Sequence, residues 1–527
     1  MPAGPAAHPP LGSTPSDKVV GSSPSPSSDP TPRGRSHDRS AHVVPRPDTS
    51  GARGALDRFF EITKRGSTYA REIRGGVLTF VTMAYIVVLN PLILGGFSAD
   101  AATLDIDGDW LRASQVGAAT ALTAGVMTIL FGLVARLPFA FAAGLGINSF
   151  LAVSVVGEVT WPEAMGLVVI NGLVIVLLAT TGLRTLIFRA VPRELKTAIT
   201  VGIGLFIAFI GFVDSGFVRG TGVPASPLAL GIDGSIASLP TVVFIVGLVI
   251  MGVLMARRVP GALLIGIVAT TLIAIVVEQV FHIGPSNTSG ATGWNLNAPV
   301  VPGVPVALPD LGLVGAFDFG AFGRIGIISS LMLVFTLVFT NFFDAMGTMT
   351  GLAKAADLSD ERGDFPRLKG ALVVEGFGAV AGGATSSSSN TVFIESASGI
   401  GEGARTGLAS MVTGVLFLLA MFFTPLTQVV PLEVAAAALV IVGTLMASQI
   451  RDIVWTDFSV ALPVFLTVVV MPLTYSIANG IGVGFLSWVL VRSLSGRARE
   501  VSPLLWVVSA GFLVFFARGP IEQLLGV

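Results

Sequence analysis

Cysteine is absent from this 527-residue chain, and histidine occurs only four times. The missing thiols exclude disulfides, thiolate nucleophiles and cysteine-based zinc sites. Charged side chains are also scarce: they make up 12% of the residues, whereas a soluble protein has roughly 25%. This scarcity excludes a water-soluble globular enzyme, and the near balance of 31 basic and 32 acidic residues excludes a basic protein that binds nucleic acid.

Apolar residues dominate instead, with 52% hydrophobic side chains and 63 glycines. They gather in stretches close to the ~20 residues that a helix needs to cross a bilayer. We therefore predict an all-α polytopic membrane protein with fourteen transmembrane segments in two series of seven. The first series covers 77–95, 114–134, 138–156, 163–187, 197–215, 239–256 and 260–281, and the second covers 326–347, 369–384, 391–402, 405–425, 430–447, 457–474 and 477–494.

The basic residues of the loops test this count independently. If the N-terminus is cytoplasmic, most Lys and Arg residues fall in inside segments, and three, Arg112, Arg219 and Arg324, fall outside. Such a bias is typical of membrane proteins, whose cytoplasmic loops carry the excess of positive charge. We therefore predict a multi-pass protein of the cell membrane with a cytoplasmic N-terminus.

An odd number of spans in each half means that the second half enters the membrane upside down, as in the inverted repeats of secondary transporters. The expected organisation has five parts. They are a disordered, Pro- and Ser-rich arm (1–52), a first repeat (53–284), an extracellular loop (285–325), a second repeat (326–496) and a C-terminal apolar segment and tail (497–527). Within the last part, 502–517 could cross the membrane or lie at its surface.

Few polar side chains lie inside the predicted spans, where each is costly. Two stretches are interrupted at corresponding places, the third span of each series: 142–148 by two glycines, and 384–390 by four serines and an asparagine. Irregular backbone at membrane depth is tolerated only where it is buried in protein or lines a wet cavity. We therefore predict that the two broken helices meet at one site. The polar residues that we assign to it are Asn148, Asn390, Thr391, Asp344, Glu395 and Glu375.

Some of these residues have a simpler interpretation. A single Ser or Asn in a span commonly forms hydrogen bonds between helices, and Glu375 is open to the same structural explanation. A carboxylate beside a helix break has little structural use, which favours a functional role for Asp344 and Glu395.

At these residues the chain resembles a known family. The blocks AGLGINSFLA (143–152), FFDAMGTMTGLA (342–353) and SNTVFIESASGI (389–400) are similar to the nucleobase:cation symporter-2 family, and within it to the AzgA-like permeases for adenine, guanine and hypoxanthine. The resemblance runs from about residue 56 to 518. It implies inverted repeats of seven spans, a core domain (spans 1–4 and 8–11), a gate domain (spans 5–7 and 12–14), and a short strand at the start of spans three and ten.

The resemblance also implies roles for individual residues. The purine would lie between the two strands, held by Asn148, Asp344 and Glu395, with Asn390 and Thr391 in the same substrate set. Asn341 stands where the branch usually has Asp, so the choice among purines stays open. No cofactor or metal is expected, and the homodimers of related transporters make a homodimer the expected assembly.

A neutral base gains nothing from the membrane voltage, so its accumulation needs a coupled cation. Because no histidine lies in a span, a proton would be carried by a carboxylate, and the candidates are Asp344, Glu395 and Glu375. Sodium coupling is the less favoured option. A uracil or xanthine permease and a sulfate-type anion transporter of the same fold stay as alternatives, whereas an enzyme would need a nucleophile–base pair or metal ligands at depth.

Overall fold

A computed structural model describes residues 52–95, 107, 111–183, 190–223, 226–286, 290–359 and 365–517. The chain divides into two compact units, Met1–Thr49 and Ser50–Val527, and every described residue belongs to the second unit. The predicted disordered arm, residues 1–52, therefore lies almost entirely outside the described residues.

The first half of the described chain is helical apart from three short strands. Its helices are α1 Ala52–Phe60, α2 Tyr69–Met83, α3 Ile86–Leu94, α4 Ala113–Val134, α5 Leu145–Phe150, η1 Leu151–Val155 (a π-helical turn), α6 Trp161–Thr181, α8 Arg193–Asp214, α9 Leu239–Ala256 and α10 Ala262–Phe281. Its strands are β1 Phe141–Ala143, β2 Val218–Gly220 and β3 Leu228–Leu230, and the short helices η2 Gly290–Thr292 and α12 Ala321–Arg324 follow.

The second half begins with a long helix and again contains one short strand. Its helices are α13 Ile327–Ala355, α14 Leu368–Ala384, α15 Ser396–Gly401, α16 Gly407–Ala420, η3 Met421–Val429, α17 Leu432–Ala447, η4 Ser448–Asp452, α18 Phe458–Leu473, α19 Ile477–Arg492, η5 Ser493–Arg497, η6 Ala498–Glu500 and α20 Pro503–Phe516. The strand is β4 Asn390–Val392.

Local sequence explains several of these boundaries. Helix α6 begins with a capping box, in which Thr160 and Glu163 satisfy each other's backbone N–H groups, and it ends at Gly182, which has a φ of 78°. In α18, Pro463 and Pro472 remove backbone donors from a helix of 16 residues. Neutral polar side chains at the N-caps, such as Ser238 of α9 and Ser502 of α20, start other spans.

Ten helices in the described part of the chain are long and apolar enough to cross a membrane. Every predicted span has a helical counterpart, but four counterparts are too short for this criterion: the broken third and tenth spans, α14 with 17 residues and α18 with 16. The chain is thus confirmed as a mostly helical multi-pass membrane protein, while the count of fourteen stays a prediction.

Three helices of the first half each pack on a helix of the second half. Helix α4 packs on α16, α6 packs on α14, and α8 packs on α17. In span numbers, the second pairs with the eleventh, the fourth with the ninth and the fifth with the twelfth. In the predicted repeat, spans that are seven apart are equivalent. The pair of spans two and eleven is then equivalent to the pair of nine and four, and the pair of five and twelve is equivalent to itself. This packing is the pattern that the predicted repeat requires.

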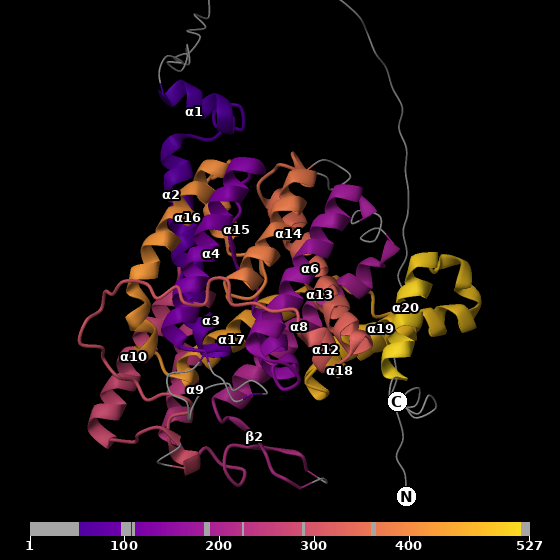
Figure 1. The fold of residues 1–527 in the computed structure, drawn as a ribbon. Helices are drawn as coiled ribbons and strands as arrows, with labels where there is room; N and C mark the ends of the chain where they lie inside the picture. The colour runs from indigo at the N-terminus through magenta and orange to yellow at the C-terminus, as the bar shows by residue number, and fades with distance from the viewer. Residues whose placement is uncertain are drawn as a thin grey trace, which may run out of the picture. The chain divides into compact units, whose positions relative to one another are not determined.

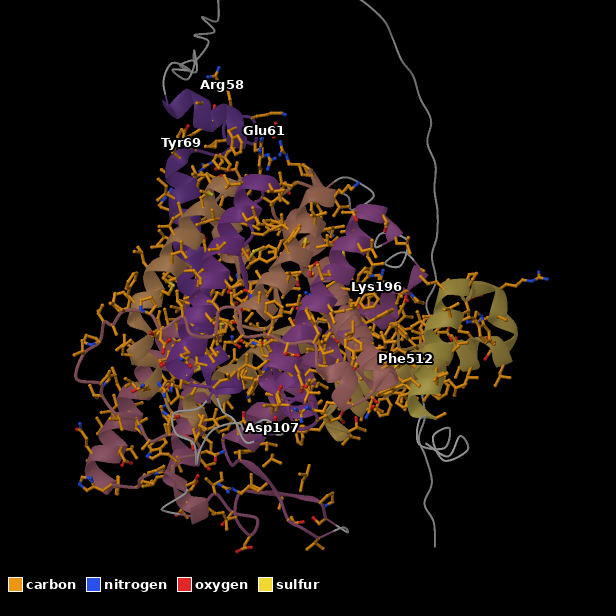
Figure 2. All side chains as sticks on the ribbon, viewed as in Figure 1. Arg58, Glu61, Tyr69, Asp107, Lys196 and Phe512 are labelled. Atoms are coloured by element: carbon orange, nitrogen blue, oxygen red, sulfur yellow. The ribbon has the colours of Figure 1, made fainter. Side chains whose placement is uncertain are left out.

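The two ends of the described bundle carry different segments. Helix α1 lies at one end and β2 at the other (Figure 1). Side chains predicted to be cytoplasmic, such as Arg58, lie at the α1 end, whereas Asp107, predicted to be outside, lies towards the opposite end (Figure 2). Asp107 pairs there with Arg324, at 3.2 Å.

Candidate functional site

The two interrupted spans meet through their strands. Strand β1 pairs with β4 in antiparallel register, with Ala142 opposite Thr391 and Ala143 opposite Asn390. The pairing continues beyond the strands, because the Gly144 N–H donates to the Ser389 carbonyl at 2.9 Å. Both strands are fully buried. The predicted meeting of the broken helices, and the short strands that the resemblance implied, are therefore present.

The serine run that precedes β4 forms a tight turn. Ser386 and Ser388 have positive φ angles of 58° and 69°, which no helix accommodates. The Asn390 amide donates to the Ser387 hydroxyl and to the Ser388 carbonyl, both at 3.0 Å, and so holds this turn in place. The Asn341 amide of α13 donates to the Ser389 hydroxyl at 2.9 Å. Both amide nitrogens therefore donate to the serine run.

Asn148 lies in α5, fully buried, and its amide donates to the Asn90 side-chain carbonyl. Asn90 in turn donates to the Thr120 hydroxyl at 2.7 Å and to the Ser387 carbonyl at 3.1 Å. A chain of amides thus links α3, α4 and α5 to the serine turn. Asn90 is absent from the residues predicted from sequence. Its position in a span, directly before Pro91, was the available signal.

The same asparagines leave their acceptors open. The side-chain carbonyl oxygens of Asn148, Asn341 and Asn390 are buried and have no hydrogen-bond partner among the described residues, and the Thr391 hydroxyl is in the same situation. Each amide nitrogen has at least one partner in the protein, whereas the three oxygens have none, so the unfilled positions of these amides include three acceptors. Buried polar groups nearly always have a partner, so an unfilled set of acceptors at a helix break indicates a place for a ligand that donates hydrogen bonds.

Three carboxylates approach this region from different elements. Asp344 of α13 and Glu395, directly before α15, are half-buried, whereas Glu375 of α14 is fully buried. Asp344 lies within electrostatic range of both Glu375 and Glu395. The structure therefore brings all three predicted carboxylates together, with Glu375 the deepest of them. Carboxylates add further acceptors and negative charge to the site.

A tyrosine completes the cluster. Tyr85, at the junction of α2 and α3, donates its hydroxyl to Glu395 Oε1 at 2.6 Å. Sequence reasoning missed this residue because an aromatic side chain in a span is usually plain packing.

Small exposed residues continue from the carboxylates along two helices. Gly347 and Gly351 share a face of α13 with Asp344, and Gly401 lies at the end of α15 beyond Glu395. A Cβ atom placed on any of these three glycines would meet nothing within 4 Å. Both faces lead towards chain segments that the loop charges predict to be cytoplasmic.

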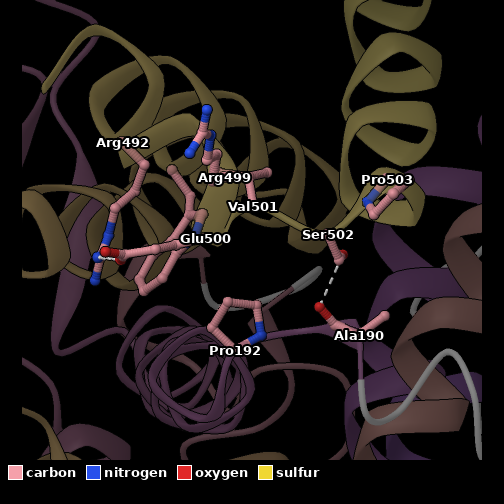
Figure 3. A pocket seen from close by; sticks show the side chains of 9 residues that line it. Ala190, Pro192, Arg492, Arg499, Glu500, Val501, Ser502 and Pro503 are labelled. Atoms are coloured by element: carbon pink, nitrogen blue, oxygen red, sulfur yellow. Dashed lines mark hydrogen bonds and ion pairs between the residues drawn. The ribbon is translucent and has the colours of Figure 1, made fainter. Parts of the chain in front are cut away.

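A separate hollow of about 430 Å³ lies between the start of α8, the end of α19 and the start of α20 (Figure 3). Ser502 donates to the Ala190 carbonyl at 3.0 Å on its wall, and Arg492 pairs with Glu500 across it. It holds none of the predicted site residues. Because none of the predicted site residues lines it, we do not assign this hollow to transport.

Comparison with known proteins agrees with this architecture. Residues 70–483 match the model of a family described as the permease family. The guanine/hypoxanthine permease PbuG of Bacillus subtilis is 38% identical over 468 residues, covering 88% of this chain and 99% of that protein. The adenine permease AdeP of Escherichia coli is 36% identical over 468 residues, covering 88% of this chain and 96% of that protein.

Solved structures show the same fold at low identity. The transmembrane domain of the cyanobacterial bicarbonate transporter BicA is 16% identical, with a TM-score of 0.56, and the match covers 78% of this chain and 97% of that domain. The murine anion transporter Slc26a9 in its inward-facing state is 10% identical, with a TM-score of 0.55 and coverage of 86% and 74%. These two likenesses concern the fold alone. The family model and the relatives above 30% identity establish that the chain belongs to the permease family, as its resemblance to the nucleobase:cation symporter-2 proteins predicted.

Proposed function

We propose that this protein imports purine nucleobases, that is guanine, hypoxanthine or adenine, across the cytoplasmic membrane by proton symport with alternating access. The names of its relatives support the substrate class, because a guanine/hypoxanthine permease and an adenine permease both align over nearly their whole length. The same relatives indicate a transporter rather than an enzyme.

The observation that carries the proposal is the acceptor-rich site. Three amide oxygens without partners lie with Asp344 and Glu395 around the paired strands, and each of the three amide nitrogens already donates to the protein. A purine carries ring and exocyclic N–H groups along its edges, and these can donate to such acceptors. Glu395 and Asn148 hold the base in this proposal, and Asn390 and Thr391 belong to the strand against which it lies.

The case for proton coupling rests on the neutral charge of the base. A neutral base is not driven by voltage, whereas one proton moved through 100 mV contributes about 2.3 kcal/mol, enough for roughly fiftyfold accumulation. Asp344 and Glu395 are half-buried and close together, so they can exchange protons with water and sense each other's charge. We assign proton coupling to Asp344, acting on the contact between Glu395 and the base, with Glu375 as the deeper partner. No other cofactor or metal is part of the proposal.

Orientation and assembly belong to the same proposal. The open glycine faces of α13 and α15 lead to the basic side of the molecule, which supports a cytoplasmic N-terminus and an inward-facing state. A homodimer formed through the gate domain, in the lipid bilayer, is the expected assembly.

A sulfate-type anion transporter is the principal alternative, because the solved neighbours of this fold include transporters of bicarbonate and other anions. The electrostatics of the site oppose it. Asp344 and Glu395 would repel an anion at close range, and three nearby amide oxygens without partners add further acceptors. A uracil or xanthine permease would differ only in a few contacts, so the base must be identified by measurement.

The direct test is uptake of radiolabelled guanine, hypoxanthine, adenine, uracil, xanthine and sulfate into permease-deficient cells, with and without an uncoupler. We expect uptake of a purine that the uncoupler abolishes. Glu395→Gln should abolish this uptake at normal membrane abundance, because an amide replaces the accepting carboxylate. The matched control is Glu402→Gln, at the other end of α15, where the carboxylate pairs with Arg74 at 3.4 Å on the surface and uptake should persist. Sulfate uptake, or full activity of Glu395→Gln, would contradict the proposal.

A further inference from the structure

Glu395 is held by a helix from the other half of the chain. Tyr85 is fully buried, and its hydroxyl donates to Glu395 Oε1 at 2.6 Å. Among the described residues, it is the only side chain that donates a hydrogen bond to this carboxylate. A buried tyrosine needs a partner for its hydroxyl. Here that partner is Glu395, the half-buried carboxylate that holds the base in the proposed function.

A second contact lies one turn earlier on α2. The Thr82 hydroxyl lies 3.4 Å from the Glu395 backbone carbonyl, although it also donates to the closer Thr79 carbonyl at 2.9 Å. The helices approach closely because both carry glycine: a Cβ atom on Gly399 would lie 2.4 Å from the Gly75 carbonyl oxygen. The end of α2 therefore contacts the backbone of Glu395, and the junction between α2 and α3 holds its side chain.

This support is needed because Glu395 lies at a weak point of the fold. It precedes α15, which has only six residues and contains two glycines. The negative charge of Asp344 lies within its electrostatic range, and Glu375 lies within range of Asp344. Without a donor on one oxygen, the side chain of Glu395 could adopt several rotamers. Binding of the base would then have to select one of them, and this loss of conformational entropy would weaken binding.

We propose that Tyr85 is a positioning residue for substrate binding: its hydroxyl holds Oε1 of Glu395, so that Oε2 is the atom presented to an N–H group of the base. This inference rests on the proposed function. Tyr85 itself does not touch the substrate in this arrangement. It acts by orienting the carboxylate before the base arrives.

The test compares variants of the full chain, purified and reconstituted in proteoliposomes, with guanine, hypoxanthine and adenine as substrates. Tyr85→Phe keeps the ring and removes the hydroxyl. Its KM should rise about tenfold or more, as expected for a lost hydrogen bond to a charged group, with a much smaller change in maximal rate. Thr82→Val, which leaves the Tyr85 contact in place, should raise KM less. Tyr475→Phe is the matched control, because that ring packs on Phe206 and Phe209 in the gate domain, and its KM should not change.

An infrared measurement reads the contact without any substrate. The carboxylate band of Glu395 is identified by its loss in Glu395→Gln, and it should shift in Tyr85→Phe but not in Tyr475→Phe. An unshifted band, or an unchanged KM in Tyr85→Phe, would overturn the inference. Failure of the wild-type protein to take up any of the three bases would instead overturn the proposed function, while the infrared comparison would still report whether Tyr85 holds Glu395.

Discussion

Three asparagines of the site, Asn148, Asn341 and Asn390, each donate to the protein through the amide nitrogen and leave the amide oxygen without a partner among the described residues. The Asn148 amide bonds Asn90, the Asn341 amide bonds Ser389, and the Asn390 amide bonds the serine turn. This arrangement decides the polarity of the site, because an amide held the opposite way would present donors. Under the proposed function, these oxygens and the adjacent carboxylates would favour a ligand rich in N–H groups.

At the N-terminal cap of α18, just before the helix begins, one carboxylate supports a prediction about pH. Asp457, which caps α18, accepts from the Ser459 hydroxyl at 2.7 Å and from Arg497 at 2.8 Å. The Ser459 hydrogen bond, followed by Arg497, lowers the pKa of Asp457 from its ordinary value to about 2. Because the pKa is lower in the folded state, the stabilisation is complete above about pH 4 and is lost as the pH falls towards 2.

We therefore expect Asp457→Asn to lower the unfolding temperature of the purified protein at pH 7, and the difference from wild type to shrink below about pH 4. Thermal unfolding across this pH range measures it. Asp452→Asn is the control, because Asp452 makes only a loose pair with Arg451 at 3.9 Å. A difference that stays constant down to pH 3 would show that the charge of Asp457 is not the cause.

At the residue level, the sequence indicated the acids and amides of the site because each polar residue in a span is costly. Asp344, Glu395 and Asn148 could be chosen on that ground alone. Tyr85 and Asn90 could not, because their importance lies in contacts with residues about 300 positions further along the chain. The direction of each amide also depends on those long-range partners.

At the level of elements, glycine allows the helices that support the site to approach closely. Helix α6 packs on α14, which leads directly into the serine turn. A Cβ atom on Gly172 of α6 would lie 2.4 Å from the Val380 backbone nitrogen and 2.8 Å from the Gly376 carbonyl oxygen. Backbone atoms cannot move aside as a flexible side chain can. Small residues at such crossings are typical of membrane helices.

Gly172→Ala should therefore destabilise the protein by about 1–3 kcal/mol through overpacking, and purine uptake should fall because α14 carries the turn. Gly252→Ala is the matched control: it lies within α9, where an added Cβ meets nothing within 4 Å, and the better helix propensity should leave stability equal or slightly higher. Thermal unfolding and uptake measure both variants. Equal behaviour of the two would show that the α6–α14 contact can relax.

The elements themselves were largely predictable, since hydropathy marks a span with few alternatives. The predicted range 239–256 coincides with α9, and 477–494 differs from α19 by two residues. The broken spans were predicted from glycine and serine, which are poor helix formers. Their strands followed from the resemblance only, because three residues with no alternating pattern, such as Phe141–Ala143, do not indicate a strand by themselves.

At the scale of the whole molecule, the site lies where the two halves meet. The β1–β4 pair, the link from Tyr85 to Glu395, and the helix pairs α4–α16 and α6–α14 all join one half to the other. Neither half can therefore form the site alone. In the proposed alternating access, this group of helices would move as one body against α8–α10 and α17–α19.

The inward-facing state and the orientation can be tested together, because the natural chain has no cysteine and every introduced thiol is unique. In intact cells, a membrane-impermeant maleimide should label Ser226→Cys, in the exposed segment between β2 and β3, and should not label Ser495→Cys, beyond α19. In inverted vesicles the labelling should reverse: Ser495→Cys should be labelled and Ser226→Cys should not.

Gly347→Cys, which faces open space one turn from Asp344, tests the open state. It should be labelled only from the cytoplasmic side, and a bound purine should protect it. Gly252→Cys, in α9, where an added Cβ meets nothing within 4 Å, is the control for unspecific labelling. Labelling of Gly347→Cys from outside would reverse the assignment of the open state, because the path along α13 would then lead to the extracellular side.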